Sequence, residues 1–99
     1  MKLFIFARFH AREGQEHALE ALLRAQPDLV RAEPGCLEMG IYRSVRDPRL
    51  FWIHSRWADE AAFNMHANLP NTDRFIERAE QLIDHPLDVT RSRSLEEDV

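Results

Sequence analysis

The chain has 99 residues, of which 44% are hydrophobic and 30% are charged, and its formal net charge is −4. These values describe one domain of ordinary globular composition without the clustered basic face of a nucleic-acid-binding protein. No apolar run approaches the roughly 20 residues that a membrane helix needs. Cys36 is the only cysteine, which excludes a disulfide framework. We therefore expect a cytoplasmic protein that binds neither nucleic acid nor membranes.

The first half of the chain predicts a strand, an interrupted helix and a second strand. Residues 2–10 are rich in Phe, Leu and Ile and predict the first strand. From about residue 15, apolar residues recur at three- and four-residue spacing, which predicts a helix. Pro27 must kink this helix or begin a second piece, because proline lacks the N–H that a helical hydrogen bond needs. The Pro-Gly pair at 34–35 ends the helix, and residues 36–44 predict a strand.

A hairpin and a capped helix follow. The Arg-Asp-Pro-Arg segment at 46–49 predicts a turn, and residues 50–57 predict a third strand that pairs with the second. Asp59 is a suitable N-cap for a helix over roughly 60–68, because its carboxylate can accept a hydrogen bond from a free backbone N–H.

The last part of the chain predicts one more helix and one more strand. Pro70 ends the preceding helix, and Asn71 or Thr72 is expected to cap a helix that continues to about residue 84. Residues 87–95 alternate between apolar and polar side chains, which predicts a final strand.

This order of elements, βαββαβ, predicts an α+β fold of the ferredoxin-like type, with helices on one face of a four-stranded antiparallel sheet. We expect residues 1–95 to form this domain and residues 96–99 to form an acidic C-terminal tail.

The strands carry apolar side chains on both faces. In the first strand Leu3, Ile5 and Phe9 point to one side, whereas Phe4 and Phe6 point to the other. The third strand has the same two-sided pattern. Because helices can cover only one face, a second copy of the sheet is the simplest cover for the other. The pattern therefore predicts a homodimer.

His66 is the most informative single residue. It follows Ala62 and Phe63 on the inner stripe of its predicted helix, where the pattern calls for an apolar side chain. An inward histidine beside aromatic rings can act as a general base toward a phenol or enol. A buried neutral histidine bonded to a backbone carbonyl fits the same pattern, and the sequence leaves both interpretations open.

Two further aromatic residues, Trp57 and Tyr42, each fit two structural roles. Trp57 ends the third strand, with Ser55 on the same face, and either lines a binding pocket or plugs the core between sheet and helix; the residues alone favour the plug. Tyr42 is expected to share a strand face with Cys36 and Glu38, where it would lie at the edge of a pocket or in the dimer interface.

Other chemistry is not indicated. The histidines show no HxH or HxxxH spacing and no partnering carboxylate, which argues against a metal site. The three glycines form neither GxGxxG nor GxxxxGK[ST], so we expect no phosphate-cradling loop and no flavin or nicotinamide cofactor. Cys36 fits better as a small buried thiol at a strand start than as a nucleophile paired with histidine.

Several segments together resemble one known family. They are Gly14-Gln15-Glu16, Arg31 to Cys36 (Arg-Ala-Glu-Pro-Gly-Cys), the Asp47-Pro48 turn, the strand from Phe51 to Trp57, and Glu60 to Phe63 followed by His66. In this combination the chain resembles the antibiotic biosynthesis monooxygenase family over nearly its whole length.

The resemblance implies a dimeric α+β barrel, in which two ferredoxin-like sheets pack face to face. It also implies a cofactor-independent monooxygenase or quinol oxidase that acts with O₂ on a small electron-rich aromatic molecule. His66 and Trp57 fall on the family's pocket positions as candidate catalytic residues. The implied substrate-binding residues are Ser55, Tyr42, Phe63 and Phe75.

Two departures from the family pattern bear on function. Many members carry Glu at the position of Ser55, which leaves a non-catalytic small-molecule-binding stress-response protein as one alternative. An isomerase or tautomerase using the same pocket without O₂ is another. The haem-degrading branch uses an Asn and a His at the positions of Ala7 and Ile76, so the resemblance does not imply haem.

Overall fold

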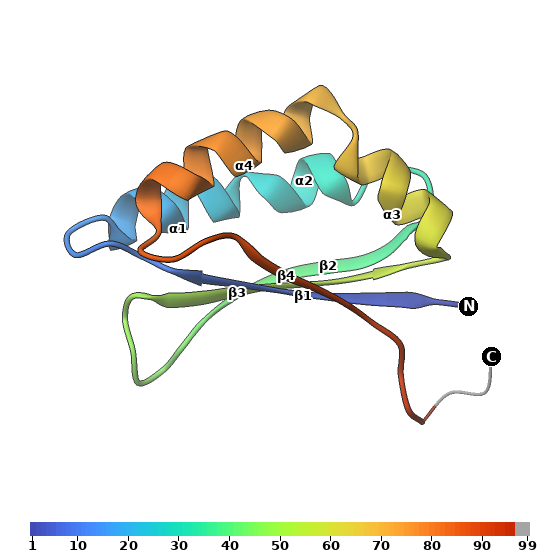
Figure 1. Cartoon of the computed structure of the whole chain (residues 1–99), viewed down its shortest axis with the longest axis horizontal. Coiled ribbons are helices and arrows are strands. Elements are labelled where there is room, and N and C mark those ends of the chain that lie inside the picture. The colour runs from blue at the N-terminus through green and yellow to red at the C-terminus, as the bar shows by residue number, and fades with distance from the viewer. Residues whose placement is uncertain (97–99) are drawn as a thin grey trace.

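The computed structural model describes residues 1–96 and has two layers, with the helices on one side of a sheet (Figure 1). The elements in chain order are β1 (Leu3–His10), α1 (Glu16–Arg24), α2 (Gln26–Val30), β2 (Cys36–Arg43), β3 (Leu50–Trp57), α3 (Glu60–Ala67), α4 (Pro70–Leu82) and β4 (Asp88–Ser92).

The four strands lie in the order β2-β3-β1-β4, and every neighbouring pair is antiparallel. This arrangement confirms the predicted ferredoxin-like α+β fold. None of the helices in residues 1–96 is long and apolar enough to cross a membrane.

Two predicted helix signals are confirmed. The first helical segment is interrupted as expected, since α1 ends before Pro27 and the proline lies in the first turn of α2. There its missing N–H costs nothing, because the first backbone N–H groups of a helix have no internal partner. Asp59 caps α3 by accepting a hydrogen bond at Oδ1 from the backbone N–H of Ala62 over 2.8 Å.

Two predicted boundaries are wrong. Neither Asn71 nor Thr72 caps α4: the cap residue is Leu69, Pro70 is the first helical residue, and no side chain bonds the cap. The last strand is shorter than predicted, because β4 pairs with β1 only as far as Ser92, and Leu95 is 92% exposed. Of the predicted acidic tail, residues 97–99 lie outside the described residues.

The two faces of the sheet differ in what covers them. The face under the helices carries the buried core, including Ile5, Phe9 and Trp57. The other face, called here the open face, has aromatic side chains that no element within residues 1–96 covers. They are Phe4, Phe6, Tyr42, Trp52 and His54, of which Phe6, Tyr42 and Trp52 are exposed, and Arg8, Glu38 and Arg56 lie on the same face. The two-sided apolar pattern predicted for these strands is therefore present.

A β-bulge corrects one facing assignment. The register of β2 shifts between Cys36 and Glu38, so that Cys36 lies opposite Trp57 while Glu38 lies opposite Arg56. Strand alternation predicted that Cys36 and Glu38 share a face, and this prediction is wrong. Tyr42 lies with Glu38 on the open face, because the alternation resumes after the bulge.

A polar cluster at one end of the sheet ties three segments together. The ring of His10, at the end of β1, lies with Nδ1 2.7 Å from Oδ2 of Asp84 and Nε2 3.0 Å from Oδ2 of Asp47. Arg49 also contacts Asp84 over 3.3 Å. The hydrogen bond from His10 lowers the pKa of the Asp84 carboxyl, and a backbone N–H bond from Arg49, together with His10, lowers that of Asp47. The cluster joins β1 to the β2–β3 turn and to the segment after α4.

Asp84→Asn should weaken the pH dependence of stability in acid. A carboxyl whose pKa is lowered on folding stabilises the protein above its unfolded pKa, which is 3.8 here, and that stabilisation is lost as the pH falls through the folded value. The variant should have a lower free energy of unfolding than the wild type at about pH 6, and a smaller difference from it at about pH 2. Urea titrations across this range measure both. Asp88→Asn is the control, since Asp88 makes no ion pair within residues 1–96; equal effects of the two substitutions would contradict the prediction.

The turn between α2 and β2 packs tightly against α3. Gly35 has φ +82°, a conformation that residues with a Cβ atom rarely adopt, and its carbonyl accepts a hydrogen bond from Ala58 N over 2.8 Å. A Cβ atom at position 35 would overlap the Cβ of Ala62 in α3. Only glycine therefore allows this turn to lie directly against the helix.

Gly35→Ala should destabilise the protein more than Gly14→Ala. Both glycines have positive φ, near +82° and +83°, but a Cβ at Gly14 would meet no atom within 4 Å. We expect a loss of about 1 kcal/mol for Gly14→Ala from the backbone alone, and of about 2–4 kcal/mol for Gly35→Ala once the steric overlap is added. Chemical denaturation measures both values. Adding Ala62→Gly to Gly35→Ala should recover part of the lost free energy of unfolding, because it removes the overlapping Cβ atom. Equal losses for Gly14→Ala and Gly35→Ala would contradict the steric argument.

Candidate functional site

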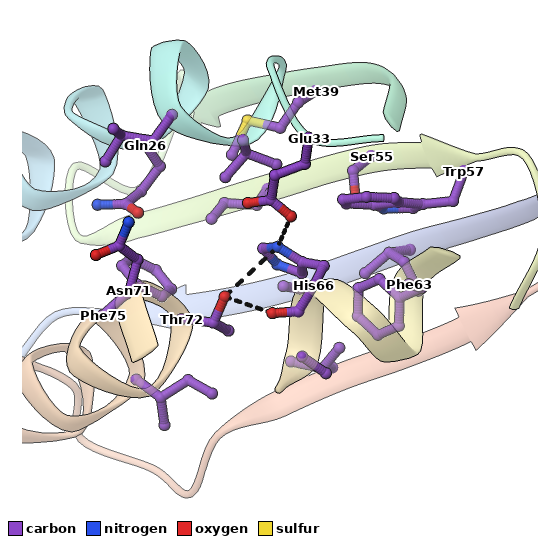
Figure 2. Close-up of a pocket in the computed structure, with 18 of the residues that line it drawn as sticks. Gln26, Glu33, Met39, Ser55, Trp57, Phe63, His66, Asn71, Thr72 and Phe75 are labelled. Atoms are coloured by element: carbon purple, nitrogen blue, oxygen red, sulfur yellow. Dashed lines mark hydrogen bonds and ion pairs between the residues drawn. The ribbon is translucent and has the colours of Figure 1, made fainter. Parts of the chain in front are cut away.

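A cavity of about 300 Å³ lies between the helices and the covered face of the sheet (Figure 2). Most of its wall is apolar, built from inward side chains of the strands and from the inner faces of α3 and α4. Ile5, Phe9, Ile53, Trp57, Phe63 and Phe75 are among the residues that line it. A volume of this size suits a small molecule with one or two rings.

His66 and Glu33 form the principal polar contact of the cavity wall. Nδ1 of His66 lies 2.8 Å from Oε1 of Glu33, and both side chains are largely buried, with exposed fractions of 17% and 16%. The hydroxyl of Thr72 donates to the backbone carbonyl of His66 over 2.6 Å, and its oxygen lies 3.5 Å from Nδ1. Figure 2 shows the imidazole between Glu33 above it and Thr72 beside it.

This contact determines which nitrogen of His66 is available. A carboxylate only accepts hydrogen bonds, so Nδ1 carries the hydrogen and donates it to Glu33. In the neutral imidazole Nε2 then has the free lone pair. No residue among 1–96 hydrogen-bonds Nε2, and none of their buried side-chain nitrogen or oxygen atoms lacks a partner, so Nε2 is accessible. The pair therefore presents an oriented proton acceptor.

Two aromatic rings hold the imidazole in place. The ring centroid of His66 lies 4.9 Å from that of Trp57 and 5.5 Å from that of Phe63. Phe63 meets Trp57 edge to face, and the guanidinium of Arg91 covers Phe63 at 4.9 Å. These contacts restrict rotation of the histidine ring, so Nε2 keeps one direction.

Trp57 fits both interpretations that the sequence left open. It is fully buried, as a core plug would be, and it also lines the cavity. Its indole N–H donates to Oγ of Ser55 over 2.9 Å. Because that N–H is already bonded, the tryptophan contributes its ring face to the cavity. The hydroxyl of Ser55 acts as acceptor in this bond, so its own hydrogen can be donated.

The local sequence explains how each member of the pair reaches the cavity. Asp59 caps α3 so that Phe63 and His66, three residues apart, share its inner face. Glu33 comes from the α2–β2 turn, whose close approach to α3 depends on Gly35. The two residues are 33 positions apart in sequence and meet because the turn packs on the helix.

The structure brings five of the six predicted site residues to one cavity. His66, Trp57, Ser55, Phe63 and Phe75 all line it. Tyr42 does not: it lies on the open face, with its ring across Gly40.

Sequence reasoning missed Glu33, and the expectation that no histidine has a partnering carboxylate is wrong. The only signal was a glutamate in the Ala-Glu-Pro-Gly segment, and a charged residue before Pro-Gly normally points to solvent. Its inward direction depends on the docking of the turn, which no local pattern encodes.

The other groups considered from the sequence lie outside this chemistry. Burial raises the pKa of the Cys36 thiol, which is the opposite of what a nucleophilic cysteine needs. Within residues 1–96 no three His, Cys, Asp or Glu side chains gather as a metal site would require.

The fold and the site together define a class: a ferredoxin-like α+β protein with a small-molecule-sized apolar cavity and a histidine–carboxylate pair in its wall. The family model described as "Antibiotic biosynthesis monooxygenase" matches residues 3–84. The chain belongs to this family, as its sequence motifs predicted.

Individual relatives agree with this assignment. The "Putative monooxygenase Rv0793" of Mycobacterium tuberculosis is 30% identical over 93 residues, which cover 94% of this chain and 91% of the relative. Its solved structure superposes with a TM-score of 0.91 and 27% identity, covering 100% of both chains. The structure of PA3566 from Pseudomonas aeruginosa gives a TM-score of 0.86 at 32% identity, covering 95% and 94%.

A shorter match is found with the "Putative monooxygenase YcnE" of Bacillus subtilis, at 31% identity over 62 residues that cover 63% of this chain and 65% of the relative. The family and the names of these relatives support a monooxygenase-like function in general terms.

Proposed function

We propose that this protein is a cofactor-independent monooxygenase or quinol oxidase for a small electron-rich aromatic substrate. The observation that carries the proposal is the oriented pair of His66 and Glu33 in the wall of an apolar cavity. Such a pair supplies what this chemistry needs from a protein: a base, a dry site and a fixed position for the substrate.

The reaction begins with proton transfer. Nε2 of His66 takes a proton from a phenol or enol, and the Glu33 carboxylate stabilises the imidazolium that forms. The substrate anion then gives electrons to O₂. In a quinol oxidase, two electrons and two protons convert O₂ to H₂O₂ and the quinol to a quinone. In a monooxygenase, an activated CH₂ carbon of the anion bonds to O₂, the resulting hydroperoxide loses water, and a carbonyl group remains.

Two further features support this assignment. The hydroxyl of Ser55 lies in the cavity wall and can donate its hydrogen to the oxygen of a substrate anion. The absence of Glu at position 55 was the main argument for a non-catalytic binder, and Glu33 weakens that argument because it gives His66 a carboxylate from another segment.

His66→Ala should lower the rate of substrate-dependent oxygen uptake by about two orders of magnitude or more, as expected for loss of a general base. The measurement is oxygen consumption with a panel of quinols and polyphenols. Glu33→Gln should give an intermediate loss, since the amide oxygen still accepts from Nδ1 but no longer offsets the charge of the imidazolium.

His17→Ala and Glu13→Gln are matched controls, because both residues are exposed and neither lines the cavity. An unchanged rate in His66→Ala would remove this histidine from the mechanism. Turnover that persists without oxygen would instead indicate a tautomerase, which uses the same base but needs no O₂.

The proposed assembly is a homodimer formed through the open face of the sheet. The argument is the exposure of Phe6, Tyr42 and Trp52, together with the stacking of His54 on Phe6 with ring centroids 4.7 Å apart. A face of this composition is stabilised when a second copy of the same sheet excludes water from it.

Trp52→Glu should shift the protein from dimer to monomer. Sedimentation at micromolar concentration should give twice the chain mass of 11.6 kDa for the wild type and the single mass for the variant, because a carboxylate in the proposed interface is costly to desolvate and the apolar area of Trp52 is lost. Val45→Glu is the control, since Val45 is fully exposed in the β2–β3 turn. A stable, folded wild-type monomer would contradict the proposal.

A further inference from the structure

Two side-chain amides lie in the wall of the cavity, away from Trp57 and Phe63. Gln26 comes from the start of α2 and Asn71 from the first turn of α4, and both line the cavity. Figure 2 shows them pointing toward one another, on the far side of His66 from Trp57. Gln26 is half-buried and Asn71 is exposed, which places the amides where the cavity meets solvent.

A neighbour fixes the orientation of each amide. Nε2 of Gln26 donates to the backbone carbonyl of Leu22 over 2.9 Å, so Oε1 is the atom left to accept a hydrogen bond. Oδ1 of Asn71 accepts from the guanidinium of Arg74, one turn later in α4, so its N–H₂ group is left to donate. In the described part of the chain no hydrogen bond joins the two amides.

The two amides therefore present a free acceptor, Oε1 of Gln26, and a free donor, the N–H₂ group of Asn71, toward one another in the cavity wall (Figure 2). A hydroxyl group is complementary to this arrangement, because it donates one hydrogen bond and accepts another. An ether or a carbonyl oxygen can only accept, so it can bond to Asn71 but cannot donate to Oε1 of Gln26. A hydroxyl therefore gains one hydrogen bond more than an ether or a carbonyl at this end of the cavity.

We propose that Gln26 and Asn71 recognise a second hydroxyl group of the substrate, and so select aromatic diols over monophenols and over their methyl ethers. This inference rests on the proposed function, since it places the first hydroxyl beside His66. The apolar wall, including Phe9 and Phe75, accommodates the ring between the two polar ends.

The same arrangement favours release of a quinone product. Oxidation of a diol removes two electrons and two protons, and both hydroxyls become carbonyls. The oxygen between the amides then no longer donates to Gln26. The product keeps one hydrogen bond of two at this end of the cavity and should bind more weakly than the diol.

The test is a binding measurement without oxygen, so that it does not depend on turnover. Calorimetric titration under argon compares 1,4-dihydroxynaphthalene with 4-methoxy-1-naphthol, which lacks the second donor. The wild type should bind the diol about three- to tenfold more tightly, the range expected for one net hydrogen bond. Gln26→Met removes the acceptor at similar volume and should reduce the ratio of the two affinities to near one.

The ratio separates loss of the hydrogen bond from general damage to the cavity, because such damage weakens both ligands alike. Gln81→Met is a control with the same substitution outside the cavity and should keep the preference. Equal affinities in the wild type, or a preference that survives Gln26→Met, would overturn the inference and leave the proposed function intact. A preference for the diol without any oxygen uptake would refute the proposed oxygenase function but not the recognition of the second hydroxyl by Gln26 and Asn71. If the wild type binds neither compound, both proposals fail.

Discussion

The site depends on how closely the α2–β2 turn approaches α3. Gly35 allows this approach because its positive φ and missing side chain let the turn lie against Ala62, and the turn then directs Glu33 toward His66. Asp59 fixes the start of α3, which in turn fixes the face on which His66 lies. A local steric condition at one glycine thus places a carboxylate beside a histidine, and the direction of Nε2 into the cavity follows from that contact.

The two faces of the sheet have separate roles that follow from one strand pattern. In β1 the inward residues build the cavity floor, while Phe4 and Phe6 alternate with them and point to the open face. Within residues 1–96 the open face has no cover, which is the basis for the proposed pairing of two copies. Tyr42 belongs to this second role, because the bulge in β2 sets the facing of the residues after it.

The polarity of the cavity is unevenly distributed, and this has chemical consequences. Near Trp57 the indole N–H is already bonded to Ser55, whereas Nε2 of His66 is left free. In an apolar surrounding, the attraction between the Glu33 carboxylate and an imidazolium at His66 is stronger than it would be in water. The amides of Gln26 and Asn71 add a second polar end, so the cavity has two positions at which oxygen atoms of one substrate can bind.

The sequence by itself determined the βαββαβ order, the break at Pro27, the Asp59 cap, the inward position of His66 and the membership of the family, because each depends on local periodicity, proline geometry or contiguous motifs. It also indicated that both sheet faces are apolar. Only the tertiary structure decided that Glu33 reaches His66, that Tyr42 lies away from the cavity, and that His10 joins two distant aspartates. These contacts connect residues 33 to 74 positions apart in the chain or depend on a single bulge. No short-range pattern encodes such distances, since they result from the packing of one finished element on another.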